Sequence, residues 1–273
     1  ALMRKLNSGE LSADEKEVIE TEGKYLRGGF YLGSPEFYQW IGEQGAQENT
    51  LEMDRIGRVN SVTGPDYELE VQQRRHARFM NICMMATPLG GAASETLPDG
   101  RVVSGVGGQY NFVSMAADLP EARSVLMFHA ARGEKSESNI RWDLPNLTIP
   151  RHLRDIYVTE YGIADLRFAS DEECIKRMLR ISSSDAVTNL KESAVAAGKL
   201  GSSVDSNELN LDVIRQRNTL GALEKRFAAF RRNGSLIDYP LGSDFTQVEQ
   251  RLVKALQVLK KETASTRGKI RLL

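Results

Sequence analysis

The sequence predicts an α/β fold: an open, mainly parallel sheet with flanking helices and a helical C-terminal end. Two observations indicate it. Short apolar runs such as residues 124–128 and 155–159 are continuous rather than alternating, which favours strands in a parallel sheet covered on both faces. From Ser170 onward, apolar residues recur at helical spacing instead. A chain of 273 residues can form one large domain or two ordinary ones.

The first part of the chain mixes predicted helices and short strands. Residues 1–22 have rough helical spacing, and glycines bound a short aromatic strand in residues 25–33. Ser34 and Pro35 are typical of a helix start, and we expect that helix to end near residue 41. We then expect a loop over 42–52, a strand over 55–62, a polar stretch over 66–78, a strand over 79–86, a turn at 97–100, and strands at 102–103, 124–128, 147–150 and 155–159.

Helices dominate the prediction after residue 170. Ser170 with Glu173 three positions later forms a capping box ahead of an apolar-periodic run. We expect further helices over 186–200, 209–230 and 246–263, an extended piece over 236–240 and a loose basic tail over 264–273.

Composition and charge exclude several classes of function. The net charge of −1 gives no general attraction to nucleic acid or to an anionic membrane. No apolar run reaches the roughly 20 residues of a membrane span, and no signal peptide is visible. Cys83 and Cys174 lie far apart among apolar neighbours, and the three histidines define no metal set. We therefore expect a cytoplasmic protein with two buried free thiols, no metal, and neither nucleic acid nor membrane as a partner.

The most informative stretch is a glycine loop between an apolar pair, residues 102–103, and a helix-compatible run from Phe112. Gly105, Gly107 and Gly108 would let backbone amides point at an anion. The alternative is a tight strand-to-helix turn that serves packing alone. The glycine spacing does not match a dinucleotide-binding fingerprint, which disfavours a nicotinamide-dependent enzyme.

Several blocks together resemble the acetyl-CoA hydrolase/transferase family of the class I CoA-transferases. They are the glycine loop at residues 102–112, the Thr-Glu-Tyr-Gly-Ile-Ala-Asp-Leu block within 158–167, and residues 73–81, 28–33 and 239–246. The resemblance covers the C-terminal half of a family member. It implies a connecting segment over residues 1–65 leading from an N-terminal half, a CoA-transferase-like α/β domain over 66–263, and the basic tail over 264–273.

Members of this family are expected to use a glutamate nucleophile, which forms an acyl anhydride and then a glutamyl-CoA thioester. The resemblance places that glutamate upstream of the 28–33 block, and so before Ala1. Residues 51–53 (Leu-Glu-Met) match its motif only superficially. The chain also begins without an initiator methionine and within a helical pattern, so we expect a fragment that is inactive alone.

The resemblance assigns roles to five residues. Gly107 and Gly108 would donate to the thioester oxyanion, and Gln109 would line the same place. Asn81 would bind a substrate carboxylate, with a strand-edge amide bonded to backbone as the alternative. Glu160 would lie in the active site without being the nucleophile, with a structural ion pair to Arg151 or Arg154 as the alternative. The basic run at residues 74–78 is interpreted as a solvated face or a site for CoA phosphates.

Two functions follow as hypotheses. The first is the C-terminal domain of a CoA-transferase that moves CoA between an acyl-CoA and a carboxylic acid, or of an acyl-CoA hydrolase. The second is a non-catalytic CoA-binding or interaction module without the nucleophile. The resemblance implies CoA or acyl-CoA as substrate, no tightly bound cofactor, and an acyl-CoA, a carboxylate and the protein's own N-terminal half as partners. It also implies a homodimer or larger oligomer.

Overall fold

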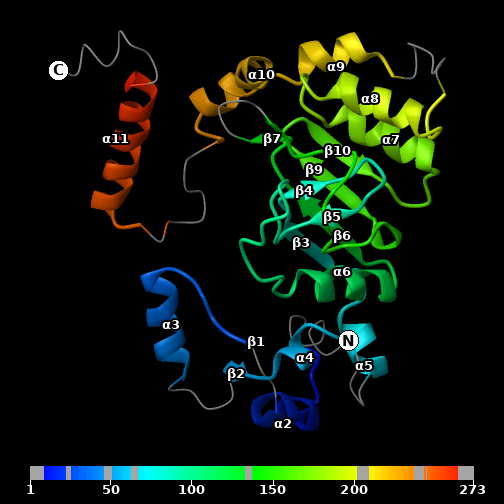
Figure 1. The fold of residues 1–273 in the computed structure, drawn as a ribbon. Coiled ribbons are helices and arrows are strands. Elements are labelled where there is room, and N and C mark those ends of the chain that lie inside the picture. Colours follow the sequence, from blue (N-terminus) through cyan, green and yellow to red (C-terminus); the bar gives the residue numbers. More distant parts are fainter. Residues whose placement is uncertain are drawn as a thin grey trace. The chain divides into compact units, whose positions relative to one another are not determined.

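The computed structural model describes residues 9–22, 26–45, 51–62, 67–132, 137–201, 209–236, 243 and 245–263. The chain forms two compact units (Figure 1). One comprises Ala1–Val59 with Gly234–Leu273, and the other comprises Asn60–Asn233. The predicted tail over 264–273, most of the extended piece over 236–240 and the start of the first predicted helix lie outside the described residues.

The second unit is built on a four-stranded sheet in the order β10-β9-β6-β3. Its strands are β3 (Arg78–Ile82), β6 (Arg123–Met127), β9 (Ile156–Thr159) and β10 (Gly162–Asp165). Strands β3, β6 and β9 are parallel, and β10 returns antiparallel to β9. The mainly parallel sheet is thus confirmed, and three strands end at the same edge.

One face of this sheet carries the core. On β6 the side chains of Ser124 and Leu126 are buried, and their partners across the register, Phe79 and Asn81 of β3, lie on the same face. Helix α6 (Gln109–Asp118) packs on this face, where the Phe112 ring stacks on Phe79 with centroids 5.8 Å apart.

The other face is more open, which corrects the expectation of a sheet covered on both sides. Met80 and Ile82 of β3 are 65% and 77% exposed, and Ile163 of β10 is 70% exposed. Their apolar character makes the runs look continuous in the sequence. Apolar side chains favour burial, but whether another segment covers this face of the sheet depends on the rest of the chain and not on the strand sequence.

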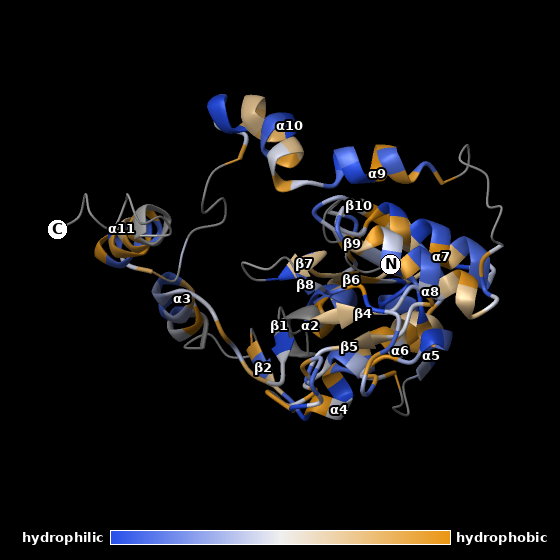
Figure 2. Ribbon diagram, turned by 45° about the horizontal axis from the view of Figure 1, so that its top comes forward, coloured by the Kyte–Doolittle hydropathy of each residue, from blue (hydrophilic) through white to orange (hydrophobic). Residues whose placement is uncertain are grey.

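Helices α7 (Asp171–Arg180) and α8 (Val187–Ala196) complete the core of this unit (Figure 2). Helix α7 packs against β10 and α8, and it buries four apolar side chains on one side: Cys174, Ile175, Met178 and Leu179. Its opposite side is charged, so the sequence period observed after Ser170 corresponds to an amphipathic helix.

The predicted helix over 209–230 is two helices, α9 (Leu211–Arg217) and α10 (Leu220–Arg232). Asn218 separates them because its Nδ2 donates to the carbonyl oxygens of Arg180 and Ser182, at 2.9 and 2.6 Å. Thr219 then caps α10 by accepting from the Ala222 amide. The buried side-chain amide of Asn218 thus ends the helix, although the helical spacing of apolar residues continues past it in the sequence.

Short elements differ most from the prediction in this unit. The run over 79–86 divides into β3 and β4 (Met85–Ala86), and β4 pairs with β5 (Ala92–Ala93). Strands β7 (Ala131–Arg132) and β8 (Glu137–Ser138) pair in the same way. The stretches at 102–103 and 147–150 form only isolated bridges, and α5 (Tyr67–Gln73) occupies the predicted polar stretch. The turn at 97–100 is confirmed.

The first unit contains α2 (Ala13–Glu22), β1 (Leu26–Gly28), α3 (Pro35–Gly45), β2 (Leu51–Met53), α4 (Ile56–Val59) and α11 (Gln247–Thr263). Ser34 caps α3 as predicted, accepting from the Phe37 amide at 3.3 Å. The predicted loop over 42–52 instead contains the end of α3 and the start of β2. The predicted strand over 55–62 is wrong, because residues 56–59 form α4, where the Arg55 carbonyl accepts from the Arg58 amide at 2.9 Å.

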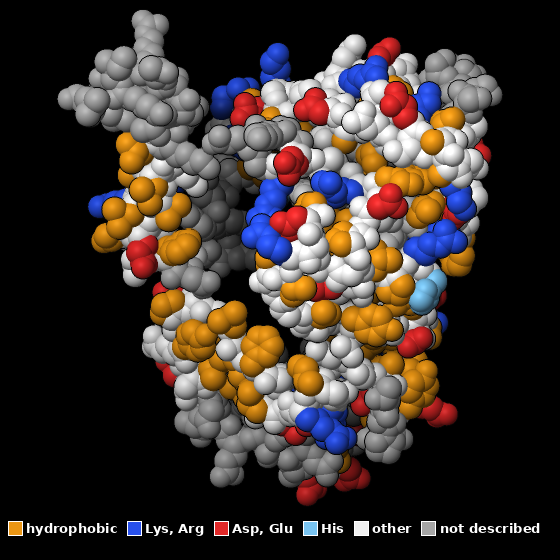
Figure 3. Space-filling view, in the orientation of Figure 1, with side chains coloured by type: hydrophobic (Ala, Val, Ile, Leu, Met, Phe, Trp, Pro, Cys, Tyr) orange, Lys and Arg blue, Asp and Glu red, His pale blue; other side chains and the backbone are white. Residues whose placement is uncertain are grey.

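Side chains of both charges are mixed with apolar ones over the surface that Figure 3 displays. None of the helices within the described residues is long and apolar enough to cross a membrane.

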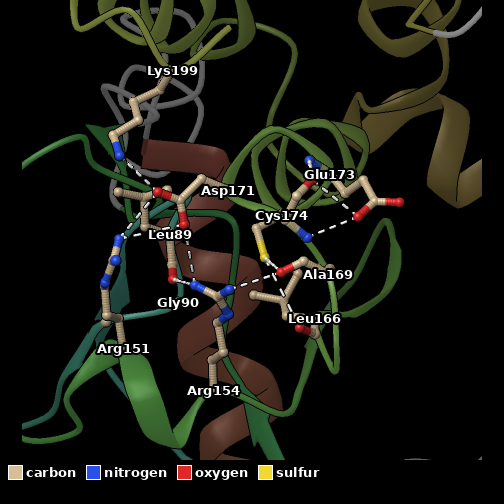
Figure 4. Close-up of polar contacts among 12 residues, drawn as sticks. Leu89, Gly90, Arg151, Arg154, Leu166, Ala169, Asp171, Glu173, Cys174 and Lys199 are labelled. Carbon is tan, nitrogen blue, oxygen red and sulfur yellow. Dashed lines mark hydrogen bonds and ion pairs between the residues drawn. The ribbon is translucent and has the colours of Figure 1, made fainter.

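A charged cluster fixes the start of α7 (Figure 4). The Asp171 carboxylate contacts Lys199 at 2.7 Å, Arg151 at 3.3 Å and Arg154 at 3.5 Å. The hydrogen bond from Lys199 holds the pKa of Asp171 below its usual value, although burial opposes this. Arg154 also donates to the carbonyl oxygens of Leu89 and Ala169, so the cluster joins two loops to the helix.

The predicted capping box is present at the same helix end. Ser170 Oγ accepts from the Glu173 amide, and the Glu173 carboxylate accepts from the Ser170 amide. We expect Ser170→Ala to lower the free energy of unfolding by about 1 to 2 kcal/mol, because the Glu173 amide loses its acceptor. Urea denaturation followed by circular dichroism measures this. Ser170→Thr keeps the hydroxyl as acceptor and as donor to the Glu173 carboxylate, so its stability should stay near that of wild type. Equal stability of the alanine variant would contradict the capping role.

Candidate functional site

The glycine loop leads directly into α6, which begins at Gln109 rather than at the predicted residue 112. Gly107 has a φ of +63°, and a Cβ added there or at Gly105 would meet no atom within 4 Å. Gly105 therefore has no packing reason to be glycine among the described neighbours. Gly108 differs, because a Cβ there would lie 2.7 Å from Asn60 Nδ2.

The amino end of α6 is left free for an anion. Gly108 occupies the N-cap position, and no side chain caps the helix. Amides of the first turn have no acceptor within an α-helix, so an uncapped start presents N–H groups and the positive end of the helix dipole. A glycine loop at this position allows a ligand to approach the backbone closely.

Gln109 ties this helix end to the sheet. Its side chain is buried, and its Nε2 donates to the Ile82 carbonyl at 2.9 Å while its Oε1 accepts from Ser94 Oγ at 2.5 Å. The amino end of α6 therefore lies at the carboxyl end of β3. Both amide atoms of Gln109 bond within the protein, and its contact with substrate stays a prediction.

Asn81 lies on β3, one residue before Ile82, on the face that α6 covers. Its Nδ2 atom is buried and has no hydrogen-bond partner among the described residues. This donor is thus not used for the backbone hydrogen bond of the alternative interpretation. A buried donor without a partner is costly, and a ligand oxygen would satisfy it.

Glu160 follows β9 at the same edge of the sheet. Its side chain is 16% exposed, accepts from the Ala130 amide at 2.9 Å and lies 3.8 Å from Nδ1 of the exposed His129. The alternative of an ion pair with Arg151 or Arg154 is wrong, because both arginines contact Asp171 instead. Glu160 has no Lys or Arg partner among the described residues.

A cavity of about 660 Å³ opens at the carboxyl ends of the three parallel strands. Most of the lining residues end or follow β3, β6 and β9, and the others belong to β7 or follow β8. They are Ile82, Cys83, Met84, Met127, Phe128, His129, Ala131, Arg132, Asn139, Val158, Thr159 and Glu160. The structure therefore places Glu160 on the cavity wall. The cavity lining does not include Gly107, Gly108, Gln109 or Asn81. They adjoin the cavity through Ile82, whose carbonyl accepts from Gln109 and which follows Asn81 in β3.

Cys83 lines this cavity, and Cys174 lies on the buried side of α7, in the core. Both thiols are free and buried, as predicted. Burial raises the pKa of Cys83 to about 12 and also raises the pKa of Cys174. The reactive thiolate is therefore scarce at pH 8. We expect a disulfide reagent to label neither thiol in the folded protein at pH 8, and both after unfolding in urea. Fast labelling of the native protein would contradict this burial.

A buried acidic network beside the loop escaped the sequence analysis. Glu95 is 8% exposed and accepts from Asn146 Nδ2 at 2.8 Å, from the Ser94 amide and from the Thr148 hydroxyl. Ser104, at the start of the loop, donates to the Ser94 carbonyl. The polar run Ser-Glu-Thr after two alanines is the only signal the sequence offers for it.

Comparisons with known proteins bear on the family and the fold of this chain. The family model of the acetyl-CoA hydrolase/transferase C-terminal domain matches residues 33–194. RipA from Yersinia pestis has a similar fold, with a TM-score of 0.54 and 20% identity, over 72% of this chain and 42% of that one. A point mutant of RipA gives a TM-score of 0.56 with the same identity and coverage.

A weaker likeness is to 4-hydroxybutyrate CoA-transferase from Porphyromonas gingivalis, with a TM-score of 0.47, 21% identity, and coverage of 72% of this chain and 43% of that one. The search of curated proteins found no significant match. The chain spans well under half the length of these solved structures.

Proposed function

The chain belongs to the acetyl-CoA hydrolase/transferase family, as its C-terminal domain, and on that premise we propose that it supplies the acyl-CoA-binding side of a CoA-transferase or acyl-CoA hydrolase site. The observation that carries this proposal is the position of the uncapped, glycine-preceded end of α6. It adjoins a cavity of about 660 Å³ at the carboxyl ends of parallel strands. That edge is where α/β sheets bind their ligands.

In this proposal the loop stabilises the negative charge that develops on the thioester oxygen. Attack of a carboxylate on an acyl-CoA places charge on the carbonyl oxygen before the CoA thiolate leaves. Amides near Gly107 and Gly108 are preorganised to donate to that oxygen, since no capping side chain competes for them. A carboxylate is a weak nucleophile, so such positioning accounts for most of the acceleration.

Asn81 and Glu160 have distinct roles in the proposal. The free Nδ2 of Asn81 donates to a carboxylate oxygen of the acceptor acid or of the nucleophile. Glu160 is held by the Ala130 amide and orients what enters the cavity. The nucleophilic glutamate expected before Ala1 stays a prediction, as does assembly into a homo-oligomer.

The test is an exchange assay on the full-length protein as its gene encodes it. We expect CoA to move from acetyl-CoA to a carboxylic acid, or hydrolysis where no acid is present. Asn81→Ala should lower kcat/KM by roughly tenfold or more, because one donor is lost from the transition state. Asn189→Ala, at an exposed position of α8, serves as the matched control.

The second candidate is a non-catalytic CoA-binding module. Among the described residues, Glu160 is the single carboxylate on the wall of the 660 Å³ cavity. It is not the expected nucleophile, so the described residues are compatible with binding without catalysis. Binding of acetyl-CoA with neither transfer nor hydrolysis would favour the module. Absence of both binding and turnover would exclude both candidates.

A further inference from the structure

A second cavity, of about 330 Å³, adjoins the first one in the same unit. The two share Met84, Arg132 and Asn139 as lining residues, so they are neighbours, and together they are called the hollow. The first part is mainly apolar, whereas three arginines line the second: Arg101, Arg132 and Arg141. They come from the 97–101 turn, from β7 and from the segment after β8.

Arg141 is the most informative of the three. Its side chain is half-buried, and its guanidinium makes no hydrogen bond or ion pair with any residue in the described part of the chain. Its backbone is nevertheless fixed, because its amide donates to the Ala86 carbonyl at 3.0 Å. Withdrawing a cation from water without a partner is unfavourable, so an external anion would stabilise this position.

The acidic residues on the wall pair with only one of the three arginines in the described structure. Asp99 is bonded to Arg101, with 2.8 Å between Oδ2 and Nε. Glu137 lies opposite Arg132 in the β7–β8 register, yet no ion pair joins their side chains in the described structure. Arg132 and Arg141 therefore both have unused donors facing the hollow.

We propose that Arg132 and Arg141, with Arg101 at the rim, form a subsite that binds an oxyanion carried by the substrate. A planar guanidinium donates two parallel hydrogen bonds to a carboxylate or to a phosphate, and two such groups favour a ligand with several equivalent oxygens. A water molecule takes up about 30 Å³, so this part of the hollow has room for a compact anionic group.

The identity of the ligand rests on the proposed function, which offers two sources for the oxyanion. One is a second carboxylate at the far end of the acceptor acid, and the other is a phosphate of CoA. The apolar cavity would then hold the chain that links this anion to the reacting carbonyl group. The subsite itself does not depend on turnover.

The test is calorimetric titration of the full chain with pyrophosphate, with succinate against butyrate, and with CoA against pantetheine. Wild type should bind pyrophosphate, and Arg141→Gln should weaken that binding by roughly tenfold to a hundredfold. Arg132→Gln, on an exposed hairpin, should weaken it as well. Arg215→Gln is the control, since Arg215 is engaged with Asp212 and Thr188 on α9 and α8.

The two sources give different patterns. If the acceptor acid carries the anion, Arg141→Gln weakens the binding of succinate and leaves the binding of CoA unchanged. If CoA carries the anion, Arg141→Gln weakens the binding of CoA and leaves the binding of pantetheine unchanged. Arg141-dependent pyrophosphate binding without any binding of acyl-CoA would support the subsite and contradict the proposed function. The subsite alone would be overturned if acyl-CoA binding required Gly107 while the Arg132 and Arg141 variants bound every tested oxyanion as wild type does.

Discussion

Replacing Gly107 by valine should lower the affinity of the chain for acetyl-CoA by at least about tenfold, and kcat/KM of an active assembly by about 100- to 1,000-fold. The φ of +63° at this position is a genuine outlier for a β-branched residue, so the loop would rearrange and its amides would turn away. No described atom lies within 4 Å of the added Cβ, so the Cβ itself meets no packing clash and the expected cause is the backbone conformation.

Gly198→Val is the matched control for this loop variant. Gly198 has a φ of +65°, its added Cβ also meets nothing within 4 Å, and it follows α8 away from the loop. Both variants should lose a similar 1 to 3 kcal/mol, roughly, of stability through backbone strain. Titration calorimetry and thermal unfolding separate the two effects. Unchanged binding in Gly107→Val would mean that the glycine loop serves packing alone.

The second large effect is expected for stability, at Gly90. We expect Gly90→Ala to lower the free energy of unfolding by roughly 3 to 5 kcal/mol, as the sum of backbone strain and overpacking. Gly90 has a φ of +87°, and a Cβ there would lie 2.6 Å from the Cβ of Arg154 and 3.2 Å from Leu166 Cδ1. The Gly90 carbonyl also accepts from the buried Tyr157 hydroxyl at 2.8 Å, so the backbone cannot move freely.

Gly100→Ala isolates the two contributions to this loss. Gly100 has the same φ of +87°, but an added Cβ meets nothing within 4 Å. It should therefore lose only the strain, about 1 to 2 kcal/mol. Urea denaturation of both variants gives the difference, which measures the close approach of Arg154. Equal losses in the two variants would show that the contact around Gly90 relaxes at little cost.

The sequence predicted the elements whose signals are local. The strands around 124–128 and 155–159, the capping box at Ser170 and the helix over 246–263 all have strong patterns of their own, and each is present. Strand β10 was not predicted, because the two-residue loop between β9 and β10, Glu160-Tyr161, contains neither glycine nor asparagine, the residues typical of such a turn. The break at Asn218 depends on partners some 36 to 38 residues away in the chain.

The candidate site was less predictable because it depends on distant segments. The family blocks predicted roles for Gly107, Asn81 and Glu160, which stay predictions, and the structure adds a cavity that Glu160 lines. Arg132 and Arg141 carry no motif in the sequence: Arg132 follows two alanines, and Arg141 follows Ile140 after a polar stretch. Only the pairing of β4, β5, β7 and β8 brings them to one hollow.

The central claim is that acyl-CoA binds where the glycine loop meets the carboxyl ends of β3, β6 and β9. Amide NMR spectra of the full chain, recorded while acetyl-CoA is added, test it most directly. We predict that the shifted amides concentrate at Gly105 to Gln109 and at the cavity residues Cys83, Phe128 and Glu160. Spectra that stay unchanged at millimolar acetyl-CoA, or that change only within residues 9–59, would contradict the account.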